Sequence, residues 1–310
     1  MSLFSRDQFR GGERWDTPIV LDLDGDGVET TGVKAGAHFD HAGDGFAETT
    51  GWVGQDDGLL VLDRNHNGVI DDGSELFGSN TVLANGQKAT NGFLALAELD
   101  ENHDGKIDAG DSAFAQLRVW RDANGNGFTA ADELLTLEQA GVLSINTGFA
   151  NSGMVDASGN SHKQLGSYTT SDGQSRAATD VWFKVDHMRS VASEWLDVPA
   201  DIAALPNLKG YGKVYDLHQA MVRDASGALQ DLVGQFVNAT SSADRQALIP
   251  QIIYTWAGVD DIAPDSRGIY MSDARMVFAL EAFLGERFLS IRRHGQSQLG
   301  LQQPLLAGQH

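Results

Sequence analysis

Three stretches of the chain place oxygen-bearing side chains at the spacing of an EF-hand calcium loop. Such a loop supplies ligands from positions 1, 3, 5, 7 (through the main-chain carbonyl), 9 and 12, with Gly at position 6. The stretches DENHDGKIDAGD and DANGNGFTAADE fit this pattern, and DRNHNGVIDDGSE fits it with the closing acid one residue late. Calcium requires this spacing because six to eight hard oxygen atoms must surround one ion. The three matches therefore predict several calcium ions per chain.

The expected ligands follow from the spacing. In the loop that begins at residue 100 they are Asp100, Asn102, Asp104, Lys106 (carbonyl), Asp108 and Asp111. In the loop that begins at residue 122 they are Asp122, Asn124, Asn126, Phe128 (carbonyl) and Glu133, with a water in place of a side chain at position 9. In the loop that begins at residue 63 they are Asp63, Asn65, Asn67, Val69 (carbonyl), Asp71 and Glu75.

A fourth acidic stretch, PIVLDLDGDGVE, begins like a calcium loop but has no acid at position 12. Its three carboxylates repel one another unless a cation lies between them, and they belong to Asp22, Asp24 and Asp26. A site here needs ligands from elsewhere in the chain, and one source is the segment that carries Asp40, Asp44 and Glu48. The alternative for each loop is a solvated Asp/Gly turn without an ion, and it is strongest for this stretch.

The acidity of the chain is concentrated in its first half. The formal net charge of the 310 residues is −21, and residues 1–150 hold 26 Asp and Glu against nine Lys and Arg. This charge favours cations and disfavours nucleic acid as a partner. The absence of Cys excludes disulfides, thiolate metal sites and cysteine catalysis. Neither an apolar run of about 20 residues nor an N-terminal signal peptide is found, so no transmembrane segment is expected.

Hydrophobic patterning predicts an α+β fold, in which a calcium-loop-rich α/β half precedes a helical C-terminal half. Short runs rich in Val, Ile and Leu predict strands at IVLDL, GLLVLD, RVW and VLSIN. The run GFLALAELD, behind a cap at Thr90 or Asn91, predicts a helix. Two more short helices are expected after the calcium loops, at SAFAQL and at AADELLTLEQAG.

The same patterning divides the chain into five regions. Residues 1–15 are expected to be a flexible tail, 16–150 a calcium-binding domain, 151–195 a β-hairpin or meander, 196–290 a helical domain, and 291–310 a second tail. In the helical domain, apolar residues recur at helical spacing from Leu229 and again from Leu248, where Pro250 kinks or splits the helix. A further helix is expected between Ser272 and Gly285.

Longer motifs resemble the iron-regulated, FrpC-like proteins of the large RTX family. The resemblance is carried by PIVLDLDGDGVET, GWVGQDDGLLVLDRNHNGVIDDGSELFG, GFLALAELDENHDGKIDAGDSAFAQLRVWRDANGNG and DVWFKVD, and it covers roughly residues 15–290. It implies type I secretion, with a signal at the far C-terminus, and calcium-dependent folding outside the cell. The chain contains no GGxGxDxLx repeat, so it is expected to be a segment of a longer RTX chain.

The resemblance also implies a self-processing module that starts at the LDLDGDG motif. In that module calcium drives folding, an Asp carboxylate attacks its own carbonyl carbon, and the Asp–Pro bond at the entrance breaks. A Lys amine can then capture the activated Asp. This chain has Asp16-Thr17-Pro18 at the entrance, so the residue before Pro18 lacks a carboxylate. Asp16 is the catalytic candidate only if processing is retained, and its own bond leads to the ordinary amide nitrogen of Thr17.

Two classes of function fit these observations. The first is a calcium-binding structural or interaction module of a secreted or cell-surface RTX-type protein, with calcium as the folding switch and a host or bacterial cell-surface ligand as a partner. The second is an autocatalytic processing module that cuts its own chain once. An adhesin-like role in ligand binding is a further alternative for the helical half. Mass spectrometry of the chain with calcium and with a chelator discriminates the first two classes.

Overall fold

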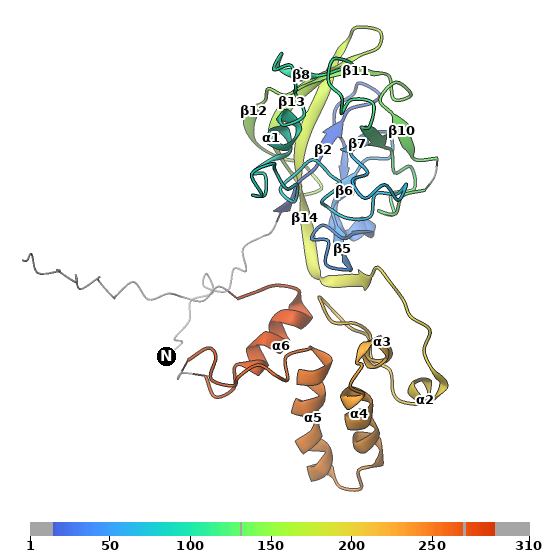
Figure 1. The fold of residues 1–310 in the computed structure, drawn as a ribbon, viewed down its shortest axis with the longest axis vertical. Coiled ribbons are helices and arrows are strands. Elements are labelled where there is room, and N and C mark those ends of the chain that lie inside the picture. Colours follow the sequence, from blue (N-terminus) through green and yellow to red (C-terminus); the bar gives the residue numbers. More distant parts are fainter. Residues whose placement is uncertain (1–14, 131, 269–270, 289–310) are drawn as a thin grey trace, which may run out of the picture.

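The fold is organised by one long strand, β14 (Ser175–Ala192), which runs the length of the sheet in Figure 1. The computed structural model describes residues 15–130, 132–268 and 271–288, so both expected tails lie almost entirely outside the described residues. Strand β13 (Ser161–Thr170) pairs with the first part of β14 on one side. On its other side β14 pairs in turn with β2 (Ile19–Leu21), β1 (Trp15–Asp16) and β5 (Phe46–Thr50), all antiparallel.

The remaining strands extend this curled sheet at both edges. One edge continues through β7 (Gly58–Val61), β9 (Arg118–Trp120) and β10 (Leu134–Thr136), and the other through β11 (Val142–Asn146) and β8 (Lys106–Ile107). Strand β12 (Ala150–Val155) pairs with β13, and β4 (Ala37–Phe39) pairs with β5. Outside this sheet, β3 (Thr30–Thr31) pairs with β6 (Trp52–Val53). The short helices near the sheet are η2 (Val33–Ala35) and α1 (Gly92–Ala97).

Both faces of the central strands are buried. Successive side chains of a strand point to opposite faces, so each strand contributes to two cores. Ile19 and Leu60 belong to a core closed by α1, whereas Val20 and Leu59 belong to a second core that contains Trp52. This two-sided burial explains why the strands IVL and GLLV are continuous apolar runs rather than alternating ones.

Among the described residues, five helices follow the sheet and form a smaller group beyond the end of β14 (Figure 1). They are α2 (Ala200–Ala203), α3 (Leu217–Arg223), α4 (Ala228–Asn238), α5 (Ser242–Trp256) and α6 (Arg275–Leu284). Apolar side chains of α2, α3 and α4 form one small core, and Tyr254, Val259 and Ala279 form another. Pro250 lies inside α5 without ending it.

The helices contact the sheet through the segment around Gly212. The Gly212 amide donates to the carbonyl of Met188 on β14 (2.9 Å), and the next amide, Lys213 N, donates to Ala282 O in α6 (2.8 Å). The Lys213 ammonium pairs with Asp44, beside the aromatic contact between Phe46 and Tyr215. The end of β14 is therefore tied both to β5 and to the helical region.

The predicted fold class is wrong. Among the described residues the dominant unit is a curled antiparallel sheet, and the expected α/β half contains a single α-helix, α1, of six residues. The sheet is completed by β13 and β14, which come from beyond the predicted boundary at residue 150. The sequence shows the local runs, but pairing between residues 19–21 and 178–180 is a long-range contact that periodicity does not reveal.

Some of the predicted strands and helices are confirmed and others are wrong. The strands at 118–120 and 142–146 and the helix capped by Asn91 are confirmed. The helices expected at SAFAQL and AADELLTLEQAG are wrong: the first is a series of turns, and the second contributes strand β10. In the second case Leu134 pairs with Trp120 of β9, so tertiary pairing overrides a local preference for helix.

Candidate functional site

The loop at residue 122 is closed by its two end acids. The fully buried Asp122 accepts hydrogen bonds from the amides of Gly125 (2.8 Å) and Gly127 (2.7 Å), and from Trp52 Nε1 (2.7 Å). Glu133 reaches back across the loop and accepts from Ala130 N (2.9 Å). The side-chain oxygens of Asn124 and Asn126 accept from amides two residues further on. All the predicted side-chain ligands thus belong to one compact turn.

The loop at residue 100 has the same construction. Asp100 accepts from the amides of Asp104 (3.2 Å) and Gly105 (2.9 Å), while Asp111 accepts from those of Glu101 (2.9 Å) and Asp108 (3.0 Å). These donors are at positions 5, 6, 2 and 9, so the two end acids face each other across the loop. Asn102 Oδ1 accepts from Asp104 N at 2.9 Å. The Lys106 ammonium pairs with Asp108 (2.6 Å) and, at 3.8 Å, with Asp104.

The loop at residue 63 closes although its last acid is one residue late. Glu75 accepts from Arg64 N (3.1 Å) and Asp71 N (3.0 Å), again positions 2 and 9. Asp63 accepts from the amides of Asn67 and Gly68, and Asn65 and Asn67 accept from the amides of Asn67 and Val69. The Asn67 side chain also donates to Asp71 at 2.7 Å.

The loops at 63 and 122 are paired at position 8. Ile70 N donates to Thr129 Oγ1 (3.1 Å), and the Thr129 hydroxyl donates to Ile70 O (2.9 Å). In the loop at 100, position 8 is Ile107, which pairs with Ile145 of β11. Position 8 therefore joins the loops at 63 and 122 to each other and joins the loop at 100 to the sheet.

The first loop obtains its missing acid from Asp57, a residue that the sequence analysis did not select. Asp57 is fully buried and accepts from Leu23 N (3.2 Å) and Glu29 N (2.8 Å), as the closing acids of the other loops accept from their own amides. One carboxylate oxygen each from Asp22, Asp24 and Asp57 lie within 4.8 Å of one another. The sequence feature that points to Asp57 is its position directly before strand β7 (Gly58–Val61), because β7 pairs with β2.

Asp26 and the segment at 40–48 have other surroundings. Asp26 lies on the exposed side of the first loop, where its amide donates to Asp24 Oδ1 (3.2 Å). Asp40 heads a turn of its own and accepts from the amides of Gly43 and Gly45. Asp44 pairs with Lys213, and Glu48 contacts His187 on β14. The structure thus does not bring this segment to the first loop.

The leading and closing acids of the four loops are mostly buried and accept hydrogen bonds from neutral groups. Seven of these eight acids are buried, namely Asp22, Asp57, Glu75, Asp100, Asp111, Asp122 and Glu133. In the part of the chain that the structure describes, Lys and Arg form ion pairs with none of the seven. Burying a carboxylate without a counter-charge costs several kcal/mol. The donor set, carboxylate and amide oxygen, is the one that calcium takes.

The pKa values of the first loop reflect this crowding. Burial, with the nearby charge of Asp22, raises the pKa of Asp57 to about 6. Partial desolvation and the Asp26 carboxyl group raise the pKa of Glu29 to about 7, although its side chain is exposed. In the loop at 63, burial also raises the pKa of Glu75. The free loops therefore hold carboxyl groups that resist ionisation, which a divalent cation would relieve.

The peptide bond between Thr17 and Pro18 lies in a tight, buried site at the entrance to β2. Pro18 O accepts from Val181 N (3.0 Å), and Thr17 Oγ1 accepts from Ser79 N (2.8 Å). A Cβ atom on Gly78 would overlap the carbonyl oxygen of Thr17, so only Gly fits there. The Asp16 main chain pairs with Phe183 of β14. The Thr17–Pro18 bond is thus held in place by β14 on one side and by the turn at Gly78 and Ser79 on the other.

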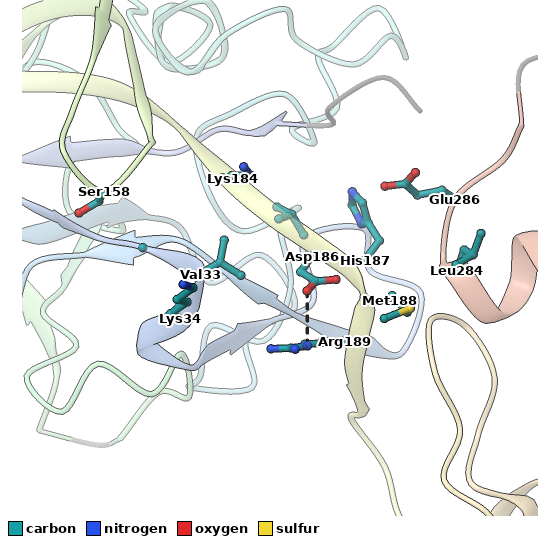
Figure 2. Close-up of a pocket in the computed structure, with 12 residues that line it drawn as sticks. Val33, Lys34, Ser158, Lys184, Asp186, His187, Met188, Arg189, Leu284 and Glu286 are labelled. Atoms are coloured by element: carbon teal, nitrogen blue, oxygen red, sulfur yellow. Dashed lines mark ion pairs between the residues drawn. The ribbon is translucent and has the colours of Figure 1, made fainter. Parts of the chain in front are cut away.

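A cavity of about 650 Å³ lies beside β14 and does not include these loops (Figure 2). Its lining has both signs of charge, with Lys34, Lys184 and Glu286 at its rim and an ion pair between Asp186 and Arg189 (3.6 Å). The mixed charges converge on no common point, and the cavity is not assigned to the candidate site.

Comparison with known proteins identifies the family to which the chain belongs. A profile of the SPM domain, the self-processing module, matches residues 19–184, which include all four loops. The chain therefore belongs to the SPM domain family, and its resemblance to FrpC-like RTX proteins is confirmed.

A curated relative gives the same result. The chain is 43% identical over 245 residues to the iron-regulated protein FrpA of Neisseria meningitidis serogroup C. The match covers 78% of this chain and 22% of the relative, so the chain spans about a fifth of the relative's length. It is an RTX-type segment that includes a self-processing module. No helix among the described residues is long and apolar enough to cross a membrane.

Proposed function

We propose that this segment is a calcium-folded module in which four loops each take one ion. The observation that carries the proposal is the set of seven buried acids in these loops, which form no ion pair with Lys or Arg among the described residues. The residues that would hold the ions are those of the three EF-hand-like loops together with Asp22, Asp24 and Asp57. Bound calcium supplies positive charge that neutralises the carboxylates and offsets the cost of burying them.

The loops are placed so that ion binding acts on the whole sheet. The first loop follows β2 and takes its closing acid from the residue before β7, so it joins two central strands. The loop at 122 separates β9 from β10, and the loop at 100 contains β8 at the sheet edge. Without cations the carboxylates repel one another across these strand pairs. Calcium is therefore expected to act as a folding switch.

A calcium titration followed by circular dichroism and thermal unfolding tests this proposal. We expect a large rise in melting temperature with calcium, since an ion that binds only the folded state stabilises it by mass action. Magnesium is expected to substitute poorly, because it demands a small octahedral site and loses its water reluctantly. A melting curve and spectrum that calcium leaves unchanged would refute the proposal.

A second candidate function, self-cleavage at the entrance, is favoured by the buried Thr17–Pro18 site. We propose that this site retains the framework for cleavage but not the nucleophile, because Thr17 has no carboxylate. The unmodified chain is expected to stay intact when calcium is added. Thr17→Asp is expected to give a fragment that begins at Pro18, detected by mass spectrometry. Calcium-dependent cutting of the unmodified chain next to Asp16 would show that Asp16 is the nucleophile instead.

We also propose that the module works outside the cell, as part of a longer exported RTX-type chain. The calcium-dependent folding proposed above fits this setting, because an exported chain would meet high calcium only after it leaves the cell. A cell-surface ligand for the helical region is a further proposal, supported by exposed apolar side chains such as Trp195, Leu208 and Met276. Binding of the purified chain to bacterial or host cells, with and without calcium, tests it.

A further inference from the structure

Asp180 lies in the core beside the entrance bond. Its side chain is fully buried, and its main chain pairs with Ile19 in the antiparallel register between β14 and β2. Paired residues of two strands point to the same face of the sheet, so Ile19 and Asp180 share one face, and Thr17 lies two residues before Ile19. Diagonal neighbours across two strands are within reach of each other. The Thr17 side chain indeed interacts with the Asp180 carboxyl group.

One oxygen of the Asp180 carboxyl group accepts no hydrogen bond from the described residues. Oδ2 accepts a hydrogen bond from Gly92 N (2.5 Å), whereas Oδ1 has no hydrogen-bond partner among the described residues. Burial raises the pKa of Asp180 to about 7, against the opposing effects of the Gly92 amide and the Thr17 side chain. The groups that face it from α1 and from residue 17 are uncharged. A buried carboxyl group with such a pKa keeps its proton in a substantial fraction of the molecules at neutral pH.

On its other side, the Thr17–Pro18 bond packs closely against the turn that contains Gly78 and Ser79. Gly78 lies against the carbonyl oxygen of Thr17, and the Ser79 amide donates to Thr17 Oγ1. The side chain of residue 17 is therefore held between one fixed donor and the Asp180 carboxyl group. A carboxylate at position 17 would find the Ser79 amide as a ready hydrogen-bond donor.

We propose that Asp180 is the proton donor for cleavage of the bond before Pro18. This inference rests on the proposed processing function. In the Thr17→Asp chain, a side-chain oxygen attacks the main-chain carbonyl carbon of the same residue and forms a five-membered cyclic anhydride. The C–N bond to Pro18 breaks, and Asp180 gives its proton to the departing nitrogen. Water then opens the anhydride to two carboxyl groups, and a proton released there restores Asp180.

Two double variants on the Thr17→Asp background test the role of Asp180. Asp180→Asn keeps the size of the side chain and an acceptor for Gly92 N but cannot donate an acidic proton. Asp186→Asn, on the same strand and half-exposed, is the matched control. After calcium addition, the single-turnover rate of cleavage is expected to fall at least about 100-fold for Asp180→Asn, a usual contribution of general acid catalysis, and to stay within about twofold for the control.

The outcomes separate this inference from the function it rests on. If Thr17→Asp cuts and Asp180→Asn cuts within about threefold of it, Asp180 is not the donor, although processing is established. If Thr17→Asp stays whole in a folded, calcium-loaded state, both proposals fail. If the Asp180→Asn chain does not fold, the pH dependence of the cleavage rate of the Thr17→Asp chain tests the inference instead. That rate is expected to fall as the pH rises through about 7, and an unchanged or rising rate there would overturn the inference.

Discussion

At the residue scale, the closing acid is what turns an Asp/Gly turn into a candidate calcium loop. A leading Asp that accepts from amides three to five residues on is common in ordinary turns. Here a second buried acid faces it from across the loop, as Glu75, Asp111 and Glu133 do. The spacing of the sequence predicted these three residues. It could not predict Asp57, because that residue reaches the first loop only through the pairing of β7 with β2.

Asp57 provides the most specific test of the first loop. Asp57→Asn is expected to remove one calcium ion from the chain, because the amide oxygen can accept only one of the two hydrogen bonds from Leu23 N and Glu29 N and the negative charge is lost. At a calcium concentration of about 100 times the dissociation constant, loss of one site should cost about 3 kcal/mol of stability. Native mass spectrometry counts the ions. Asp56→Asn, at the exposed neighbouring position, is the control and should keep every ion.

Asp180 makes a prediction about stability as well as about chemistry. Its pKa is about 7 in the folded chain against an ordinary value of 3.8, so the folded state holds the proton more tightly. The resulting stabilisation is complete below pH 3.8 and is lost as the pH rises through 7. The Asp180→Asn chain has no ionisable group at this position, so it does not lose stability in this way as the pH rises. The variant should therefore gain stability relative to the unmodified chain between pH 5 and pH 8, by up to a few kcal/mol.

Urea denaturation in saturating calcium at both pH values measures this gain. Asp186→Asn, which shares the strand but is half-exposed, serves again as the control. A difference in unfolding free energy between Asp180→Asn and the unmodified chain that stays constant with pH would show that Asp180 is ionised in the folded state.

At the scale of elements, the entrance strand is positioned by its neighbours rather than by its own sequence. Residues 19–21 read as a strand from their apolar run, and that prediction is confirmed. The sequence gives no sign that the turn at Gly78 is packed on the carbonyl of Thr17, or that β14 supplies the other side. Both contacts join segments about 60 and 160 residues apart, beyond the range of local pattern.

Gly78→Ala tests the importance of this packing. The new methyl group would overlap the Thr17 carbonyl oxygen, which belongs to the main chain and has little freedom to move. We expect a loss of roughly 3 kcal/mol or more, the upper range for forcing extra volume into a packed core. Gly153→Ala, where the methyl group would meet nothing within 4 Å, should change the melting temperature little. Equal melting temperatures for the two variants would show that the entrance site is loose.

At the scale of the whole molecule, the sheet and the helices have separate cores. The two cores of the sheet consist of residues between 19 and 183, and those of the helices consist of residues between 198 and 279. The loops were predictable because their ligands are close in sequence. The class was not, because a β-sheet assembled from distant strands leaves only short apolar runs that resemble those of an α/β fold.

A chain truncated after Ser193 should therefore keep its calcium-dependent transition. Its loops, both sheet cores and β14 remain, and the lost contacts are mainly those of Gly212 and Lys213 with the end of β14 and with Asp44. Calorimetry in calcium is expected to show one cooperative transition within a few degrees of that of the full chain. Failure of the truncated chain to fold in calcium would mean that the helices are part of the sheet's stability.

The number of calcium ions retained by the folded chain tests the central claim most directly. Native mass spectrometry of the unmodified chain in calcium is predicted to show four bound ions, one for each loop, and none after chelation. The turn at Asp40 is predicted to take no ion, because Lys213 already lies against Asp44 there. A folded chain that carries no calcium under these conditions would contradict the account.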